Sequence, residues 1–335
     1  MEDGSRTFKV LSIDGGGIKG LYSAEILQQF EKEFDCHIAD HFDLLCGTST
    51  GGLIALALAD RVPAAKIVGF YEQWGRVIFP RRARIWGRAF VKLLFGMSQY
   101  SPKPLRKAAT ALFGDKLMCD LRTLVCVPSY SLTAARPYIF KRDHADGKLT
   151  RDGNTRIVDV AMATAAAPTY FPIVEAKGHE GHQFIDGGVY ANNPTLIGLM
   201  DAFRFFVGVG KRYDAISVLS ISSLDVPTGS RLRRWRGAIR QFKREVIPAF
   251  MTGQAKMTDF MMCQFDALPE FPVKYVRVPS VVVGPDQVKH VQLDSATKKA
   301  MKLIRSMGRD QGFEWKNKEE ITAFFSTPCS YRIED

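Results

Sequence analysis

The first half of the chain alternates short apolar, strand-like runs with longer stretches of mixed polarity. The run FKVLSID at 8–14 predicts a strand, and the stretch at 21–34 predicts a helix that follows it. A second apolar run at 41–47 predicts another strand, and the stretch GGLIALALA at 51–59 predicts a second helix. Strands that alternate with helices in this order are typical of a largely parallel sheet with helices on its faces. We therefore expect an α/β protein.

The second half continues this pattern, but two basic stretches interrupt it. Residues 79–120 are basic, aromatic and punctuated by proline, and the second basic stretch follows Asp225. The strand-like and helix-like segments around them are 136–142, 156–172, 182–194, 215–222, a methionine-rich helical region, 273–283 and a final lysine-rich helix. Because no clear linker divides the chain, we expect one domain over residues 1–335, with basic insert regions at about 79–120 and 226–270.

Composition and charge narrow the class of protein. The 335 residues are 46% apolar, which suffices for a sizeable core. The acidic, polar start and the lack of an apolar run long enough to span a bilayer predict a cytoplasmic protein without a secretory signal. The six cysteines form no C-x-x-C pair, so we expect buried thiols and no metal site. The formal net charge of +11 favours an anionic partner, such as a phospholipid surface, a nucleotide or a nucleic acid.

A glycine loop, DGGGIKG at 14–20, follows the first predicted strand. Gly15, Gly17 and Gly20 fit the pattern G-x-G-x-x-G, which is typical of dinucleotide-binding folds. Such a fold also needs an acidic residue at the end of its second strand to bind the ribose. Here Asp43 lies at the beginning of that strand, which argues against dinucleotide binding. Glycines at a helix start present backbone N–H groups to any anion, so the loop could also hold an oxyanion.

The second predicted strand ends in a candidate nucleophile. Gly47, Ser49 and Gly51 form the pattern G-x-S-x-G, which is typical of a nucleophile elbow between a strand and a helix. Flanking glycines relieve the crowding of such a tight turn, and the helix N-terminus favours developing negative charge at the serine. A glycine-rich helix cap is the alternative, but strand, elbow and helix all favour a nucleophilic Ser49.

The proton acceptor for Ser49 is predicted to be an aspartate. His290 lies late in the chain, where a hydrolase histidine could fall, but its charged surroundings are typical of a solvated segment. Asp186 ends an apolar run, and Gly187 and Gly188 allow a sharp turn after it. A desolvated carboxylate within hydrogen-bond reach of a serine can accept its proton. Taken alone, the D-G-G sequence would be read as an ordinary turn.

Three motifs together carry a resemblance to a known family. DGGGIKG, GTSTGG and DGG, in this order over residues 8–200, resemble the signatures of the patatin-like phospholipases. The resemblance implies a three-layer α/β/α sandwich with a mostly parallel central sheet and helical, basic insertions. It implies a two-step acyl transfer that needs no metal or organic cofactor. It also implies the roles of the site residues: Ser49 as nucleophile, Asp186 as base, and the amides of Gly15, Gly16 and Gly17, with Lys19 nearby, as oxyanion hole.

The two basic stretches allow three interpretations. Their apolar residues fall at helical spacing: Ile85, Trp86, Ala89, Phe90 and Leu93 in one, and Leu232, Trp235, Ile239, Phe242 and Val246 in the other. Either helix could pack this face on the core, or dock on an anionic membrane. The arginines and lysines at 81–92 and 231–244 could instead bind a phosphorylated regulator.

A narrower resemblance supports the regulator. The opening LSIDGGGIKGLYSAEIL and the segment TRDGNTRIVDVAMATAAAPTYFP resemble bacterial patatin-like effectors of CBASS anti-phage systems. That resemblance implies a cyclic dinucleotide activator such as cGAMP, membrane phospholipids as substrates, and peripheral association with the inner membrane. We expect no nucleic-acid partner and leave open a homo-oligomer. The alternatives are an ungated patatin-like lipase of general lipid metabolism, and a dinucleotide-binding or nucleic-acid-binding protein without hydrolase activity.

Overall fold

The chain is built around one mixed β-sheet. A computed structural model describes residues 6–81, 98–226, 238–331 and 333, and within them the sheet has eight strands. The strand order is β5-β6-β3-β2-β1-β7-β8, and β4 pairs with β3 beside this path. The strands are β1 (Thr7–Ile13), β2 (Leu44–Gly47), β3 (Leu124–Ser131), β4 (Arg136–Lys141), β5 (Val174–Glu175), β6 (Gln183–Asp186), β7 (Ala215–Ile221) and β8 (Val273–Val278).

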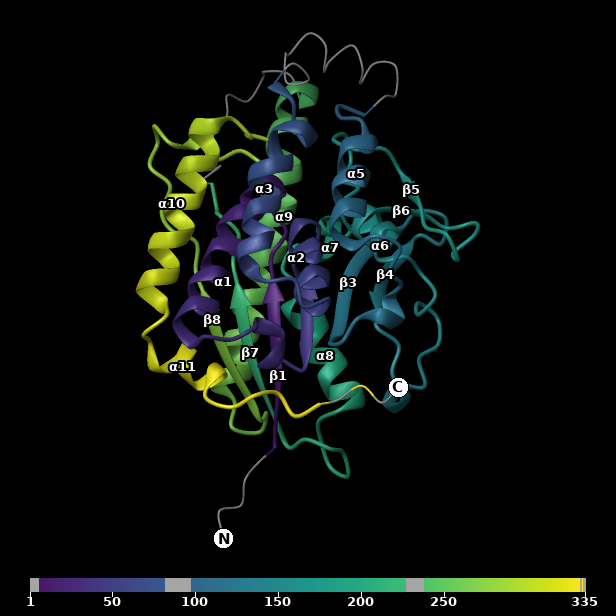
Figure 1. The fold of residues 1–335 in the computed structure, drawn as a ribbon, viewed down its shortest axis with the longest axis vertical. Coiled ribbons are helices and arrows are strands. Elements are labelled where there is room, and N and C mark those ends of the chain that lie inside the picture. Colours follow the sequence, from purple (N-terminus) through teal and green to yellow (C-terminus); the bar gives the residue numbers. More distant parts are fainter. Residues whose placement is uncertain (1–5, 82–97, 227–237, 332, 334–335) are drawn as a thin grey trace.

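The central part of this sheet is parallel. β1 pairs in parallel with β2 and β7, β2 with β3, and β7 with β8. β4 and β6 both run antiparallel to β3, and β5 runs antiparallel to β6. The predicted, mostly parallel α/β sheet is therefore confirmed. In Figure 1 the carboxyl ends of β1 and β7 point towards the end of the molecule where α3 stops and α9 starts.

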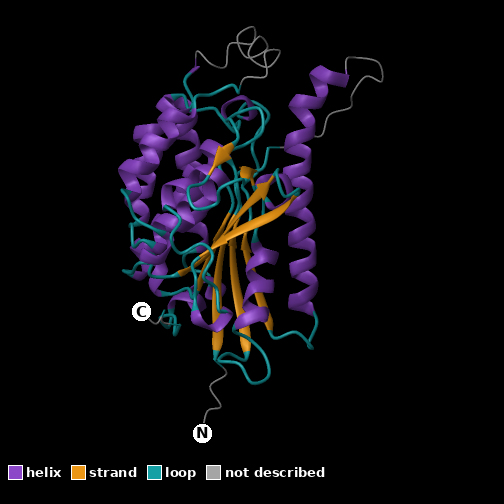
Figure 2. Ribbon diagram, turned by 90° about the vertical axis from the view of Figure 1, so that its right-hand side faces the viewer, coloured by secondary structure: helices purple, strands orange, loops and turns teal. Residues whose placement is uncertain are grey.

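Helices cover both faces of the sheet. Figure 2 shows the sheet between two helical layers, with α8 and α9 on one side. The helices are α1 (Gly20–Phe34), α2 (Thr50–Ala59), α3 (Ala64–Ile78), α5 (Pro102–Phe113), α6 (Ile157–Thr164), α7 (Gly188–Ala191), α8 (Thr195–Phe205), α9 (Ala238–Ala267), α10 (Lys298–Trp315) and α11 (Glu319–Phe325). Short 3-10 turns are η1 (Gly17–Lys19), η2 (Ile38–Asp40), η4 (Met118–Asp120), η5 (Ala145–Gly147) and η6 (Val288–His290).

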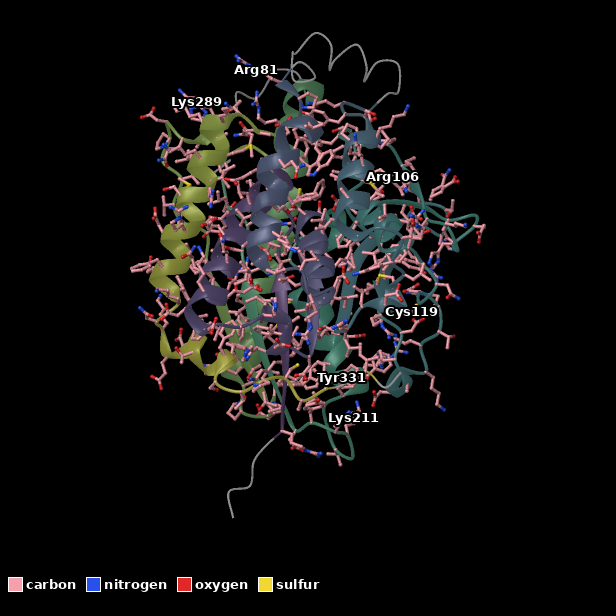
Figure 3. All side chains as sticks on the ribbon, viewed as in Figure 1. Arg81, Arg106, Cys119, Lys211, Lys289 and Tyr331 are labelled. Atoms are coloured by element: carbon pink, nitrogen blue, oxygen red, sulfur yellow. The ribbon has the colours of Figure 1, made fainter. Side chains whose placement is uncertain are left out.

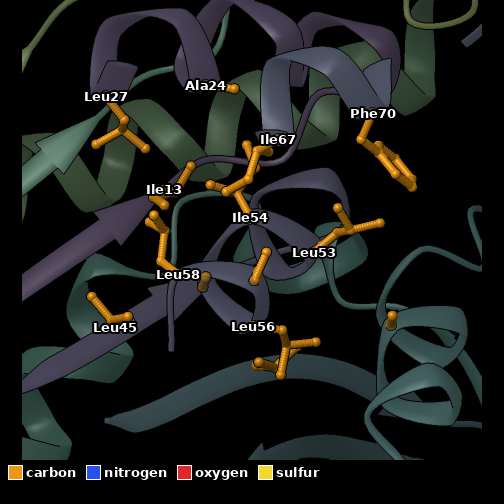
Figure 4. Close-up of a cluster of buried hydrophobic side chains, with 14 of the residues drawn as sticks. Ile13, Ala24, Leu27, Leu45, Leu53, Ile54, Leu56, Leu58, Ile67 and Phe70 are labelled. Carbon is orange, nitrogen blue, oxygen red and sulfur yellow. The ribbon is translucent and has the colours of Figure 1, made fainter. Parts of the chain in front are cut away.

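The strand residues alternate between two cores, as the pleat requires. In β1, Leu11 and Ile13 join the core formed with α1, α2 and α10, whereas Phe8 and Val10 join the core formed with α8 and α9. Every residue of α2 is buried, because its sequence is apolar all round. Figure 4 shows its side chains between the sheet and the outer helices. This helix carries the candidate nucleophile at its N-terminus.

Most predicted elements are present, with three differences in the strands, one of which is the unpredicted two-residue strand β5. The segment predicted as a strand at 273–283 ends at Val278, because Pro279 follows and cannot donate a ladder hydrogen bond. The strand β3 was not predicted, because Pro128 within its sequence argues against a central strand. On one side of β3, pairing with β2 ends at Cys126 and pairing with β6 begins at Ser129. Pro128 lies in the gap between these two partners.

The basic stretches are described only in part. Within 79–120 the structure forms α5, and α9 covers residues 238–267. The apolar faces predicted at 85–93 and 232–246 lie outside the described side chains, so their packing stays a prediction. That the chain forms one domain also stays a prediction. Figure 3 shows labelled cations at both ends of the molecule: Arg81 and Lys289 at one, and Lys211 at the other. In the part of the chain that the structure describes, no helix is long and apolar enough to cross a bilayer.

Candidate active site

Ser49 occupies a strained turn between β2 and α2. Its dihedral angles, φ 55° and ψ −121°, are rare for a residue with a side chain and typical of nucleophile elbows. The turn is tight enough that a Cβ atom on Gly47 would lie 2.1 Å from the carbonyl oxygen of Gly51. A Cβ on Gly51 would lie 2.3 Å from the carbonyl oxygen of Ile13. Both glycines of the motif are therefore required by the fold of the elbow.

The structure brings Ser49 and Asp186 into contact. The Ser49 hydroxyl donates a hydrogen bond of 2.6 Å to Oδ2 of Asp186. The sheet explains this meeting of residues 137 positions apart. β2 and β6 both pair with β3 but run in opposite directions, so the carboxyl end of β2 meets the carboxyl end of β6. Ser49 follows the first end and Asp186 forms the second.

Asp186 is in an environment that raises its basicity. The residue is 3% exposed, and burial raises the pKa of its carboxyl to about 6. The hydrogen bonds from Ser49 and from the N–H of Gly188, at 2.7 Å, oppose part of this rise. Gly187 is needed for the turn, since a Cβ there would lie 2.4 Å from the carbonyl oxygen of Pro128. At neutral pH the carboxylate is ionised and able to accept a proton.

The glycine loop lies beside Ser49, but it does not offer all three predicted amides. The N–H of Gly15 donates a 2.9 Å hydrogen bond to the carbonyl oxygen of Asn192, so this amide is occupied. In this structure Gly15 therefore anchors the loop through its amide, and its role as an oxyanion donor stays a prediction. Among the described residues, the N–H groups of Gly16 and Gly17 donate no hydrogen bond. They are the loop's available donors.

The far end of the loop is fixed by the segment before α10. Gly17 has φ 60°, and a Cβ there would lie 2.2 Å from the carbonyl oxygen of Leu293. The N–H of Ile18 donates to the same carbonyl at 2.8 Å. Lys19 does not serve the hole, because its ammonium donates to the carbonyl of Leu224 at 2.6 Å. Burial lowers the pKa of Lys19 to about 8.

An apolar cavity of about 160 Å³ opens on this site. Ser49, Asp186 and Gly17 belong to its lining, and the rest of the lining is mostly apolar, with contributions from Leu53, Phe70, Ile78, Phe171 and Phe250. α2, α3 and α9 all contribute to this lining, so both helical layers enclose the cavity. A cavity of this kind accommodates a hydrocarbon chain more readily than a sugar or a phosphate.

Sequence reasoning missed the residues that hold the elbow and the loop. The N–H of Ser49 donates at 2.9 Å to the hydroxyl of Thr164, which donates in turn to the carbonyl of Pro128 at 2.6 Å. Thr164 ends α6 in an alanine-rich run that carries no motif. Asn192 follows the D-G-G motif, but nothing in the sequence indicates that its carbonyl receives the N–H of Gly15.

Comparison with known proteins decides the family. Residues 11–199 match the family described as "Patatin-like phospholipase". The chain belongs to this family. It is therefore a carboxylic-ester hydrolase with the patatin fold, which excludes the alternative of a binding protein without hydrolase activity.

Several relatives of this patatin-like phospholipase carry the name "cGAMP-activated phospholipase". The chain is 28% identical to one from Escherichia coli (strain TW11681), over 96% of this chain and 93% of the relative. It is 35% identical to one from Pseudomonas aeruginosa, over 70% and 71% of the two chains. Among solved structures, human GIVD cytosolic phospholipase A2 is similar with a TM-score of 0.47 and 12% identity, over 96% of this chain and 60% of that one.

Proposed function

We propose that this protein hydrolyses fatty-acyl esters of membrane glycerophospholipids, with Ser49 as nucleophile and Asp186 as its proton acceptor. The observation that carries the proposal is the 2.6 Å hydrogen bond from the Ser49 hydroxyl to the buried Asp186 carboxylate. The apolar cavity supports the substrate class, because a fatty-acyl chain can fill it while its ester carbonyl reaches Ser49.

Acylation follows from this arrangement. The Oγ of Ser49 forms a bond to the ester carbonyl carbon while its proton passes to Oδ2 of Asp186. The carbonyl oxygen becomes an oxyanion, which the N–H groups of Gly16 and Gly17 and the N-terminus of α2 stabilise. When the tetrahedral intermediate collapses, the bond to the leaving oxygen breaks, and Asp186 gives its proton to that oxygen. The products are the lysophospholipid and an acyl-enzyme ester.

Deacylation reverses the roles with water. Asp186 accepts a proton from water as the water oxygen bonds to the acyl carbon, and the same amides hold the second oxyanion. Collapse breaks the bond to the Ser49 oxygen, which recovers its proton from Asp186, and the fatty acid leaves. Each step uses side chains and amides of this chain alone. That no cofactor takes part stays a prediction.

We further propose that a cyclic dinucleotide such as cGAMP activates the enzyme. The relatives named cGAMP-activated phospholipases, aligned over nearly their full length, support this, as does the net charge of +11. The predicted phosphate contacts are the basic clusters at 81–92 and 231–244, of which only Arg81 and the backbone of 238–244 lie within the described residues. Peripheral association with the inner membrane, homo-oligomerisation and the absence of a nucleic-acid partner stay predictions.

The activator is tested by assaying vesicles of phosphatidylethanolamine and phosphatidylglycerol with and without cGAMP. We expect fatty-acid release to rise at least about tenfold with cGAMP, which corresponds to about 1.4 kcal/mol of coupling. A cyclic dinucleotide of two adenines serves as the specificity control. Full activity without any nucleotide would contradict activation by cGAMP, while the proposed hydrolase function would stand.

The pKa of Asp186 sets the expected pH dependence. Because the carboxylate must be ionised to accept the Ser49 proton, kcat/KM should fall as the pH drops through about 6. Measured on a soluble ester with activator present, the profile should lose about tenfold per pH unit below this value. If the base were an exposed aspartate with an ordinary pKa, the enzyme would keep its kcat/KM down to about pH 4. A profile that is flat between pH 5 and 8 is the result that contradicts a role for Asp186 as base.

A further inference from the structure

A buried arginine contacts the first residue of the glycine loop. Arg277, on β8, forms an ion pair with Asp14, with 2.6 Å between Nη2 and Oδ2 and 3.4 Å between Nη1 and Oδ1. The side chain of Asp14 is 4% exposed and that of Arg277 is 15% exposed. Such a two-point contact fixes the orientation of both groups. Asp14 directly precedes Gly15, so its orientation decides how the loop leaves β1.

The ion pair between Asp14 and Arg277 is also held by hydrogen bonds to the neighbouring strand β7. Nη1 of Arg277 donates to the hydroxyl of Ser220 on β7 at 2.5 Å, and the N–H of Asp14 donates to the carbonyl of Ile221 at 3.1 Å. Burial raises the pKa of Asp14, and the neighbouring Arg277 guanidinium opposes part of this rise by stabilising the charged carboxylate. Of the contacts just described, only the one with Arg277 brings a cation to Asp14, so removing the arginine would take away the ion-pair partner of a buried carboxylate.

The same arginine connects the loop to α9. Nε of Arg277 lies 3.7 Å from Oδ1 of Asp259, a residue of α9. The hydroxyl of Tyr275, on β8, donates to this carboxylate at 2.8 Å and keeps it in place. Arg277 therefore stands between two carboxylates, one on the glycine loop and one on α9.

A second contact from α9 reaches the segment that binds the N–H of Gly15. Oε1 of Gln254 accepts the N–H of Asn193 at 2.8 Å, and Nε2 of Gln254 donates to the Asn193 carbonyl at 3.3 Å. The neighbouring residue, Asn192, accepts the N–H of Gly15 through its carbonyl. α9 thus holds the loop at Asp14 through Arg277 and at Gly15 through the segment 192–193.

We propose that Arg277 is a positioning residue for the oxyanion hole: it acts through Asp14, and α9 supports it through Asp259. The inference rests on the proposed function, because it assumes that Gly16 and Gly17 hold the oxyanion. Arg277 touches no reacting atom. Its effect is to fix the two amides where the transition-state charge develops, which should change kcat far more than substrate affinity.

The test compares Arg277→Met with a matched control, Arg305→Met. Arg305, on α10, also bridges two carboxylates, Glu25 at 3.0 Å and Glu72 at 2.6 Å, but these lie on α1 and α3 and not on the glycine loop. On a soluble p-nitrophenyl ester, we expect Arg277→Met to lower kcat by about 10²-fold and to change KM by less than about threefold. Arg305→Met should lower the midpoint of thermal unfolding and keep kcat within about twofold of wild type.

Two further readouts separate positioning from folding. A trifluoromethyl ketone forms a tetrahedral adduct with the serine, so Arg277→Met should weaken its inhibition by the same factor as kcat. Arg277→Lys keeps the charge but loses the two-point contact, and should recover part of the rate while staying at least about fivefold below wild type. Asp259→Asn should lower kcat by only a few-fold, because Asp14 keeps its partner.

The outcomes distinguish this inference from the function on which it rests. If Arg277→Met and Arg277→Lys keep the wild-type kcat while Ser49→Ala is inactive, the function stands and Arg277 has only a structural role. If Arg277→Met does not fold, the Lys variant decides, and a wild-type kcat there overturns the proposal. If Ser49→Ala still hydrolyses the ester, the proposed function itself fails.

Discussion

Ser49→Ala should lower kcat for phospholipid hydrolysis by about 10⁴–10⁶-fold, the range found when a hydrolase loses its nucleophile. The substitution removes the oxygen that forms the acyl-enzyme and the donor to Asp186. KM should change little, because the apolar cavity that binds the acyl chain keeps its lining. Initial rates of fatty-acid release at saturating substrate measure this effect.

A matched control for this variant is available in the chain. Ser222 is 4% exposed and Ser49 is 8% exposed, so Ser222→Ala removes a similarly buried hydroxyl that the mechanism does not use. Its kcat should stay within about twofold of wild type. Loss of activity in both variants, or in neither, would contradict the assignment of Ser49 as nucleophile.

Asp186→Asn should lower activity and raise stability at the same time. The rate should fall by about 10³–10⁴-fold, because asparagine cannot accept the proton of Ser49. The folded-state pKa of Asp186 is raised from 3.8 to about 6, so the neutral form is the one that the fold favours. The contribution of the protonated Asp186 to the free energy of unfolding is fully present below pH 3.8 and is lost as the pH rises through 6.

The size of the stability change follows from the same two values. The difference between 3.8 and about 6 corresponds to about 3 kcal/mol in the free energy of unfolding once the carboxylate is ionised. Asparagine has no such penalty, and its amide can still accept from Gly188. Urea unfolding should therefore show Asp186→Asn to be more stable than wild type by up to about 3 kcal/mol at pH 8, and equal to it near pH 3.5. A variant less stable than wild type at pH 8 would show that Asp186 is not a desolvated base.

The central motifs could be predicted because each is local. A strand, a glycine-flanked serine and an apolar helix specify the elbow at Ser49 within residues 41–59, and D-G-G specifies the turn at Asp186 in the same way. The two side chains meet because both neighbouring strands pair with β3, and β3 could not be predicted because it contains Pro128. The family resemblance, rather than the local pattern, supplied this pairing.

The support of the glycine loop could not be predicted, because it comes from distant segments without motifs. The contact between Asp14 and Arg277 joins residues 263 positions apart. Arg277 lies in a strand whose sequence, VKYVRV, gives no sign that its arginine faces a buried carboxylate. The occupied amide of Gly15 could not be foreseen either, since a run of three glycines does not indicate which N–H bonds within the fold.

Reaction of the protein with a fluorophosphonate identifies the nucleophile directly. The nucleophile forms a bond to phosphorus as fluoride leaves, and mass spectrometry of the digested protein identifies the modified residue. We expect one adduct per chain, on Ser49, formed at a rate that falls sharply in Asp186→Asn. An adduct on another residue that tracks loss of activity, or full hydrolysis by protein labelled at Ser49, would contradict this role of Ser49.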